Sequence, residues 1–313
     1  MGGSGGGGTF SGRSPDKLRE LVRKAEGKAT EAKFDGQLAN TLGELLSAVN
    51  ARDTGLVRER LDGLKTALGE ELDGTFDQFF GGSVAKHTYV DGLSDIDSLV
   101  VINDTDLEGK DPQAVLGKME RILKDALGKT ATTSHGRMAV TVQYGDGMVI
   151  QLLPALETRG SHIQVPSSRT SGWSKIDPIA FQKILTKRNE QCGGKLIPTI
   201  KLAKAINGQL PAGQCLSGYH MESLAISAFR GYSGEMSTRA MLPVFFERAK
   251  DLVLSPMKDR SGQSIHVDGY LGAANSEQRQ VASHVLGRIA RRMKNATAAS
   301  STAQWRALFG FDQ

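Results

Sequence analysis

Two aspartates at alternate positions, Asp95 and Asp97, have the residue type and the spacing of a metal site. They precede the apolar run 99–102, which is typical of a buried strand. Side chains at i and i+2 of a strand lie on the same face of a sheet. Two carboxylates held this close suit Mg²⁺ or Mn²⁺, which complete their coordination with water and with substrate phosphates. The pair therefore predicts a divalent-cation site at the start of this strand.

A glycine-rich turn, Gly81-Gly82-Ser83, ends twelve residues before Asp95 and follows a predicted short strand at 75–80. Gly82 lets the backbone approach a phosphate closely, and the Ser83 hydroxyl and nearby N–H groups can bind it. Lys86 in the connector is placed to contact phosphate as well. Each motif alone is common, the turn as a plain turn and the acids as a solvated loop or strand end. Their order and distance predict a site for a metal-chelated nucleoside triphosphate.

The segment at 81–102, GGSVAKHTYVDGLSDIDSLVVI, resembles the signature of the polymerase-beta-type nucleotidyltransferases. It is most similar to the branch that holds the 2′-5′ oligoadenylate synthetases and the bacterial CD-NTases. The latter make cyclic-oligonucleotide signals in anti-phage defence of the CBASS type. The resemblance implies that Gly82 and Ser83 hold the triphosphate and that Asp95 and Asp97 bind two Mg²⁺ ions. It extends weakly over residues 15–313.

The resemblance continues at 148–155, MVIQLLPA, where the family carries a third carboxylate on a neighbouring strand. This chain has Gln151 there, so Gln151 is predicted to line the acceptor side. A neutral amide offsets less metal charge than a carboxylate, so we expect nucleotide and first-metal binding to survive better than chemistry. Two acids remain alternatives for the missing carboxylate. Asp146 lies in a hairpin turn at an odd offset that favours the other face, and Glu157 lies beyond the proline of this segment.

Four residues of the second half are candidate nucleotide contacts. Lys201 and Lys204 lie on one face of a predicted helix and resemble a family lysine that contacts the triphosphate, although a solvated face is equally favoured. Ser217 is similar to a family serine that donates to phosphate, and it is also a predicted helix N-cap. Tyr219 either stacks on a base or packs in the core.

Composition is ordinary for a globular protein of 313 residues, with a net charge of +5 and a pI near 9.1. A mildly basic chain with only 6% aromatic residues fits nucleoside triphosphates better than a long nucleic acid. The sequence shows no apolar run of bilayer length and no signal peptide, so no membrane is expected. Cys192 and Cys215 cannot form a secreted-type disulfide framework, which favours the cytoplasm. A regulatory protein partner is not identified.

The element pattern predicts an α+β fold, with a nucleotidyltransferase-type mixed β-sheet and a helical C-terminal domain. Residues 1–13 are predicted to form a Gly-rich flexible tail, 14–170 the catalytic domain and 171–313 a helical domain that closes the nucleotide cleft. Apolar spacing predicts a capped helix from residue 14, two amphipathic helices within 38–73 and a hairpin over 138–153. Residues 159–175 are predicted to be a polar crossing loop. Further helices are predicted near residues 111–127, 178–192, 195–207, 218–230, 236–252 and 277–296.

The leading hypothesis is a soluble Mg²⁺-dependent nucleotidyltransferase that joins NTPs or dNTPs into a short linear or cyclic oligonucleotide signal. An alternative is a catalytically weakened or silent nucleotide-binding sensor of the same fold, because Gln151 replaces the third carboxylate. A third hypothesis, a transferase that modifies RNA ends, requires a strong salt-dependent affinity for RNA that the modest charge does not favour.

Overall fold

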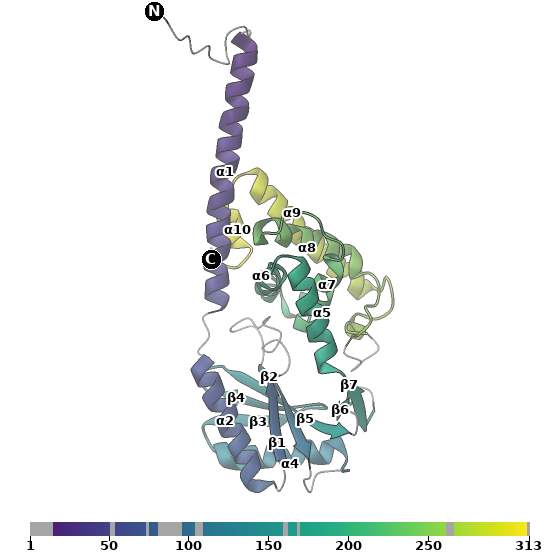
Figure 1. Cartoon of the computed structure of the whole chain (residues 1–313). Coiled ribbons are helices and arrows are strands. Elements are labelled where there is room, and N and C mark those ends of the chain that lie inside the picture. The colour runs from purple at the N-terminus through teal and green to yellow at the C-terminus, as the bar shows by residue number, and fades with distance from the viewer. Residues whose placement is uncertain are drawn as a thin grey trace, which may run out of the picture.

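The computed structural model describes residues 15–50, 54–72, 75–80, 96–103, 109–158, 162–167, 170–260 and 266–311. Figure 1 shows two halves, with a β-sheet and its covering helices below and a group of helices above. The helices are α1 (Pro15–Val49), α2 (Thr54–Glu71), α4 (Pro112–Leu127), α5 (Pro178–Gln191), α6 (Leu196–Gly208), α7 (Gly218–Ala228), α8 (Thr238–Leu252), α9 (Glu277–Ala298) and α10 (Thr302–Ala307). The strands are β1 (Thr75–Phe80), β2 (Ile96–Asn103), β3 (Ala131–His135), β4 (Val140–Tyr144), β5 (Val149–Thr158), β6 (His162–Pro166) and β7 (Trp173–Ile176).

The sheet is mixed. Its main path runs β1-β2-β5-β4-β3, with β2 and β5 parallel and the other neighbours on this path antiparallel. β6 pairs with the end of β5 and with β7. The predicted mixed sheet followed by helices is therefore confirmed.

The prediction of a crossing loop over 159–175 was wrong for its described parts, because β6 and β7 form an antiparallel pair there. These strands have five and four residues, and their sequences, HIQVP and WSKI, show too short an alternation to stand out. The exposed strand β3, ATTSH, was missed for a related reason, since it has almost no apolar residues.

One face of the sheet is covered by α2 and α4. Asp111 caps α4 by accepting a hydrogen bond from the Gln113 N–H, and Pro112 occupies the first turn. Leucines and a methionine of the two helices form one buried cluster with alternate residues of β2 and β5 (Leu61, Leu64, Leu68, Leu116, Met119, Leu123, Ile96, Val100, Ile150, Leu152). The residues of β2 and β5 that point to the other face form a smaller cluster with β6, which includes Leu99, Val101 and Ala155.

Helix α1 packs with the helical half. Phe34, Leu38, Leu42 and Leu45 are buried in the cluster that α6 to α10 also form. Residues 19–33 are exposed, and Figure 1 shows α1 projecting beyond the body of the molecule. The predicted catalytic unit, 14–170, included this helix, whereas its buried face contacts the second half. The division near residue 170 stays a prediction.

Within the described residues, no helix combines the length and the apolar character needed to cross a bilayer. Trp305 of α10 is fully buried and anchors this short helix in the helical core.

Candidate active site

The predicted metal and acceptor residues meet at the start of two parallel strands. In the β2–β5 ladder, Asp97 is the register partner of Gln151, and Ile96 is the partner of Ile150. Position 97 shares its strand parity with Leu99 and Val101, which lie on the face opposite to α2 and α4. The sheet thus brings together two positions that are far apart in the sequence.

The predicted phosphate-binding turn comes next in the sequence after β1, the edge strand beside this point. β1 ends at Phe80, whose register partner is Ser98, one residue after Asp97. Gly82, Ser83, Lys86 and Asp95 lie outside the described residues, as does the side chain of Asp97. The roles assigned to them stay predictions.

Gln151 lies between two strand neighbours, Asp97 on β2 and Thr141 on β4. Its side chain is half-buried. The chemistry of these donors fits Mg²⁺ or Mn²⁺, because a carboxylate at position 97 and an amide carbonyl at 151 are both hard oxygen ligands. Among the described side chains, no group of three or more His, Cys, Asp or Glu has the geometry of a metal site.

Asp146 does not supply the missing carboxylate. Both of its oxygens are bound by the Arg60 guanidinium of α2, at 3.0 Å and 2.9 Å. Arg60 also stacks on the Tyr144 ring, 3.9 Å from its centroid. Hydrogen bonds from Arg60 and from the Met148 N–H hold the pKa of the Asp146 carboxyl below its ordinary value. This acid fastens the β4–β5 turn to α2.

Glu157 is also remote from Gln151. It lies six residues further along β5, opposite Ile163 of β6. At about 3.3 Å per residue, this separates the two positions by roughly 20 Å. Position 151 therefore has no replacement acid from either of these two candidates.

The two candidate lysines of α6 are bound to protein groups. Lys201 Nζ donates to Asn50 Oδ1 just beyond α1, at 2.5 Å. Lys204 Nζ lies 2.7 Å from Glu222 Oε1 of α7, and both side chains are almost fully buried. The solvated-face alternative was wrong for Lys204, because its ammonium is buried against Glu222. Its contact with a triphosphate stays a prediction.

The N-terminus of α7 brings several predicted residues together. Ser217 Oγ accepts a hydrogen bond from the His220 N–H at 3.2 Å, so the predicted N-cap is confirmed. The Ser217 N–H donates to the Tyr270 hydroxyl at 3.1 Å. A Cβ added at Gly218 would lie 3.4 Å from Lys204 Nζ, which places Lys204 directly beneath this helix end. Tyr270 was not predicted, and no local pattern marks it.

Tyr219 packs on protein. Its ring centroid lies 4.6 Å from that of Phe181 of α5, and its hydroxyl donates to Asp259 Oδ1 at 2.7 Å. The sequence left two alternatives for Tyr219, stacking on a base or packing in the core, and the structure shows core packing.

Beneath the α7 N-terminus lies a fully buried polar cluster. Arg279 Nη1 binds Asp268 Oδ2 at 2.8 Å, and His220 Nε2 lies 3.5 Å from the same oxygen without a hydrogen bond. His220 Nδ1 is paired with the Tyr270 hydroxyl at 2.9 Å. Burial lowers the pKa of His220 to about 4, against the opposing pull of the Asp268 charge. The neutral imidazole is thus a structural group.

Comparison with known proteins agrees with this geometry. Residues 37–189 match the model of the Second Messenger Oligonucleotide or Dinucleotide Synthetase domain. This stretch contains β1, β2 and β5, and therefore both Asp97 and Gln151. No curated relative matches the sequence of this chain.

Solved structures share the fold over most of their length. The CD-NTase CdnG of Bradyrhizobium diazoefficiens, in complex with GTP, has a TM-score of 0.70 at 17% identity, covering 88% of this chain and 96% of that one. CdnC of E. coli MS115-1 with ATP has a TM-score of 0.65 at 17% identity, covering 87% and 97%. The cyclic AMP-GMP synthase DncV of Vibrio cholerae has a TM-score of 0.60 at 11% identity, covering 95% and 90%. The domain match over residues 37–189 confirms the resemblance to the oligonucleotide-synthesising nucleotidyltransferases, and the solved structures show that the shared fold covers most of the chain.

Proposed function

We propose that this chain is a cytoplasmic, divalent-metal-dependent nucleotidyltransferase that joins NTPs or dNTPs into a short linear or cyclic oligonucleotide signal. The observation that carries the proposal is the register pairing of Asp97 with Gln151 inside the matched synthetase domain. The similar proteins CdnG and CdnC have been solved with GTP and ATP, which supports nucleoside triphosphates as substrates. We further propose a role in anti-phage defence, on the family resemblance alone.

Each predicted site residue has a proposed role in this reaction. Asp95 and Asp97 hold the metal, and Gly82 and Ser83 bind the triphosphate. A bound divalent cation would neutralise phosphate charge and lower the pKa of the attacking hydroxyl. Gln151, beside Asp97, orients the acceptor nucleotide through its amide. In this nucleotidyl transfer the acceptor hydroxyl bonds to the α-phosphorus and pyrophosphate leaves. The step depends mainly on positioning and charge neutralisation, for which a rigid strand pair is well suited.

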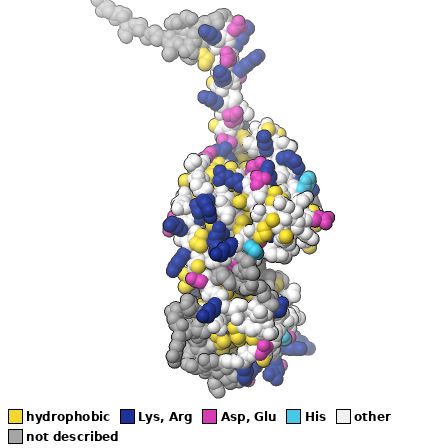
Figure 2. Space-filling view, turned by 90° about the vertical axis from the view of Figure 1, so that its right-hand side faces the viewer, with side chains coloured by type: hydrophobic (Ala, Val, Ile, Leu, Met, Phe, Trp, Pro, Cys, Tyr) yellow, Lys and Arg dark blue, Asp and Glu magenta, His cyan; other side chains and the backbone are white. Residues whose placement is uncertain are grey.

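Positive charge in the helical half complements such a substrate. On the face shown in Figure 2, Lys and Arg side chains are most crowded on the helical half, above the sheet half. Because nucleoside triphosphates carry several negative charges, a basic surface raises their local concentration. Ser217 and Lys204, at the α7 N-terminus, are candidate phosphate contacts, with Lys204 requiring release from Glu222.

The direct test is incubation of the full chain with labelled NTPs and dNTPs in Mg²⁺ or Mn²⁺, with pyrophosphate and product both measured. We expect Asp97→Asn to reduce turnover at least about a hundredfold, because one metal ligand loses its charge. The matched control is Asp125→Asn, which makes the same change at an exposed position of α4. Undiminished pyrophosphate release by Asp97→Asn contradicts the proposed site.

A second candidate function is a nucleotide sensor with little or no turnover. The observation that favours it is the neutral Gln151 at the register position beside Asp97, with Asp146 tied to Arg60. Calorimetric binding of an NTP without product after long incubation would support this alternative. Gln151→Asp is then expected to raise turnover, whereas Gln151→Leu is not, and equal behaviour of the two variants would show that position 151 is not limiting.

A further inference from the structure

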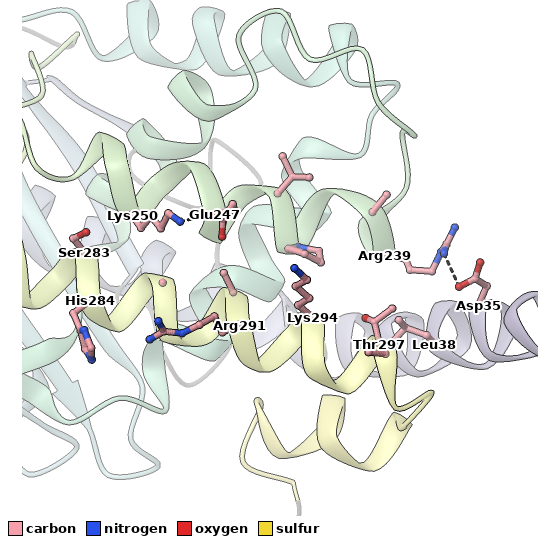
Figure 3. Close-up of a pocket in the computed structure, with 16 residues that line it drawn as sticks. Asp35, Leu38, Arg239, Glu247, Lys250, Ser283, His284, Arg291, Lys294 and Thr297 are labelled. Atoms are coloured by element: carbon pink, nitrogen blue, oxygen red, sulfur yellow. Dashed lines mark hydrogen bonds and ion pairs between the residues drawn. The ribbon is translucent and has the colours of Figure 1, made fainter.

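A cavity of about 940 Å³ opens among α1, α8 and α9, in the helical half. Figure 3 shows its walls, with α8 and α9 side by side and α1 across one end. None of its lining residues comes from the sheet, so this α1–α8–α9 groove is distinct from the Asp97–Gln151 site. Along α9 it extends from Ser283 to Ala298, which is about 22 Å at 1.5 Å per residue.

All three helices contribute apolar side chains to the lining of the groove, and we call this apolar part its floor. Leu38, Ala240, Val244 and Ala290 contribute to it from all three helices. A Cβ added at Gly287 would lie 3.4 Å from Lys250 Cδ, so glycine lets the lysine stem lie across α9. Such a floor offers a surface for burying aliphatic side chains.

The α8 wall also contains a proline. Pro243 lies inside α8 and lines the groove. Because proline has no N–H, the carbonyl of Arg239 lacks its usual helical donor at this wall.

The charges of the groove do not balance. Arg239 Nη1 is paired with Asp35 Oδ1 at 2.6 Å, and Lys250 is paired with Glu247. Arg291 and Lys294 of α9 have no carboxylate of the described residues within ion-pair distance. Figure 3 shows Lys294 extending from α9 towards α8 and Arg291 running along α9 towards His284. Two cations of α9 therefore line the groove beside its apolar floor.

We propose that the α1–α8–α9 groove docks an acidic amphipathic helix of a partner protein. The apolar floor accepts one face of such a helix, and its Glu or Asp residues pair with Arg291 and Lys294. A nucleotide fits less well, because no Phe, Tyr or Trp lines the groove for a base to stack on. The proposal concerns binding and does not depend on the proposed catalytic function.

The probe for this proposal is a fluorescein-labelled synthetic helix of about 16 residues, long enough to span the groove. It carries Leu on one face, Glu along both flanks and Ala elsewhere. A second peptide has Lys at every Glu position, and inorganic tripolyphosphate serves as a simple polyanion. Fluorescence anisotropy with the full chain measures saturable binding of each peptide, and competition measures that of tripolyphosphate.

Charge reversal supplies the first comparison. Arg291→Glu/Lys294→Glu is expected to weaken binding of the Glu peptide at least about tenfold, since each contact becomes repulsive. The matched control is Arg288→Glu/Arg292→Glu, which makes the same change at exposed positions of α9 that do not line the groove. We expect the control to bind within about twofold of the wild type.

A steric variant tests the floor without changing charge. Ala240→Leu places a larger side chain in the open space and is expected to weaken the Glu peptide about tenfold. The proposal would be overturned if the Glu peptide showed no saturable binding, or if the Lys peptide bound as tightly as the Glu peptide. It would also be overturned if Arg288→Glu/Arg292→Glu weakened the Glu peptide as much as Arg291→Glu/Lys294→Glu does. A fourth contradicting result is displacement of the Glu peptide by tripolyphosphate at an equal concentration of negative charge. The last result would assign the cations to small anions.

Discussion

Asp97 and Gln151 in the sheet half, and Lys204 and Glu222 in the helical half, are both pairs of polar positions on neighbouring elements. The first pair is set side by side by strand register, at the start of two parallel strands. The second pair is an ion pair with a 2.7 Å contact, buried between α6 and α7. In a β-sheet, the backbone hydrogen bonds fix which positions are adjacent, but they do not fix which groups the side chains contact. Helix packing encloses the side chains, so a buried charge must find its partner inside the protein.

The largest effect is expected at the buried pair. Lys204→Met leaves the Glu222 carboxylate buried without this cation, and we expect the free energy of unfolding to fall by about 3–5 kcal/mol in urea titration. Lys204→Met/Glu222→Leu should recover most of the loss. Lys201→Met, on the same helix, should cost below about 1.5 kcal/mol. If the Lys204→Met protein kept full stability but bound nucleotide weakly, Lys204 would be a triphosphate contact and not a structural partner of Glu222. That result would contradict the comparison drawn above.

Two substitutions in α1 test which part of this helix belongs to the helical half. Leu42 is 1% exposed in the helical core, so we expect Leu42→Ala to destabilise the protein by about 2–5 kcal/mol. Leu21→Ala, on the projecting part of the same helix, should change stability by less than about 0.5 kcal/mol. Denaturation followed by tryptophan fluorescence compares the two. Equal effects would show that the outer part of α1 is also packed in solution.

The buried His220 predicts a loss of stability in acid. Its pKa is about 4 in the folded protein and near 6.5 when unfolded, so the unfolded chain binds more protons between these values. Stability should therefore fall as the pH drops from 6.5 to 4, by roughly 3 kcal/mol at the end of this window.

Other charged groups face this histidine. Arg279 binds Asp268 beside it and helps to hold the pKa of that carboxyl below its ordinary value despite burial, so Asp268 adds a loss of the same sign at lower pH. His220→Gln should flatten the dependence between pH 6.5 and 4 in urea titrations at several pH values. An unchanged slope in this variant would assign the acid sensitivity to other groups.

The smallest effect is expected at Asp146, the carboxylate of the sheet half that binds Arg60. Because Asp146 is bound by Arg60, Asp146→Asn should leave nucleotide turnover within about twofold of wild type. Turnover with labelled NTPs is the measurement, with Asp97→Asn as the sensitive comparison. A large loss in Asp146→Asn would restore it as the substitute for the missing carboxylate.

Elements with strong local signals were predicted well. β1, the β4–β5 hairpin and α4 were predicted close to their observed bounds. The turn of the hairpin and the Asp111 cap of α4 depend on only a few neighbouring residues. β6 and β7 carry little pattern of their own and form because β5 extends beyond β4 and offers them an edge. The partner of α1 was missed for the same reason, since an apolar stripe shows that a helix is buried but not against what.

The candidate site shows the same division. Residue types, the alternate spacing of Asp95 and Asp97 and the N-cap at Ser217 are local properties, and they can be derived from neighbouring residues alone. Tertiary structure decided that Gln151 stands beside Asp97, that Asp146 binds Arg60 and that Lys204 is neutralised by Glu222. These are contacts between distant parts of the chain, and their energies depend on burial and on the available partner, which no short segment encodes.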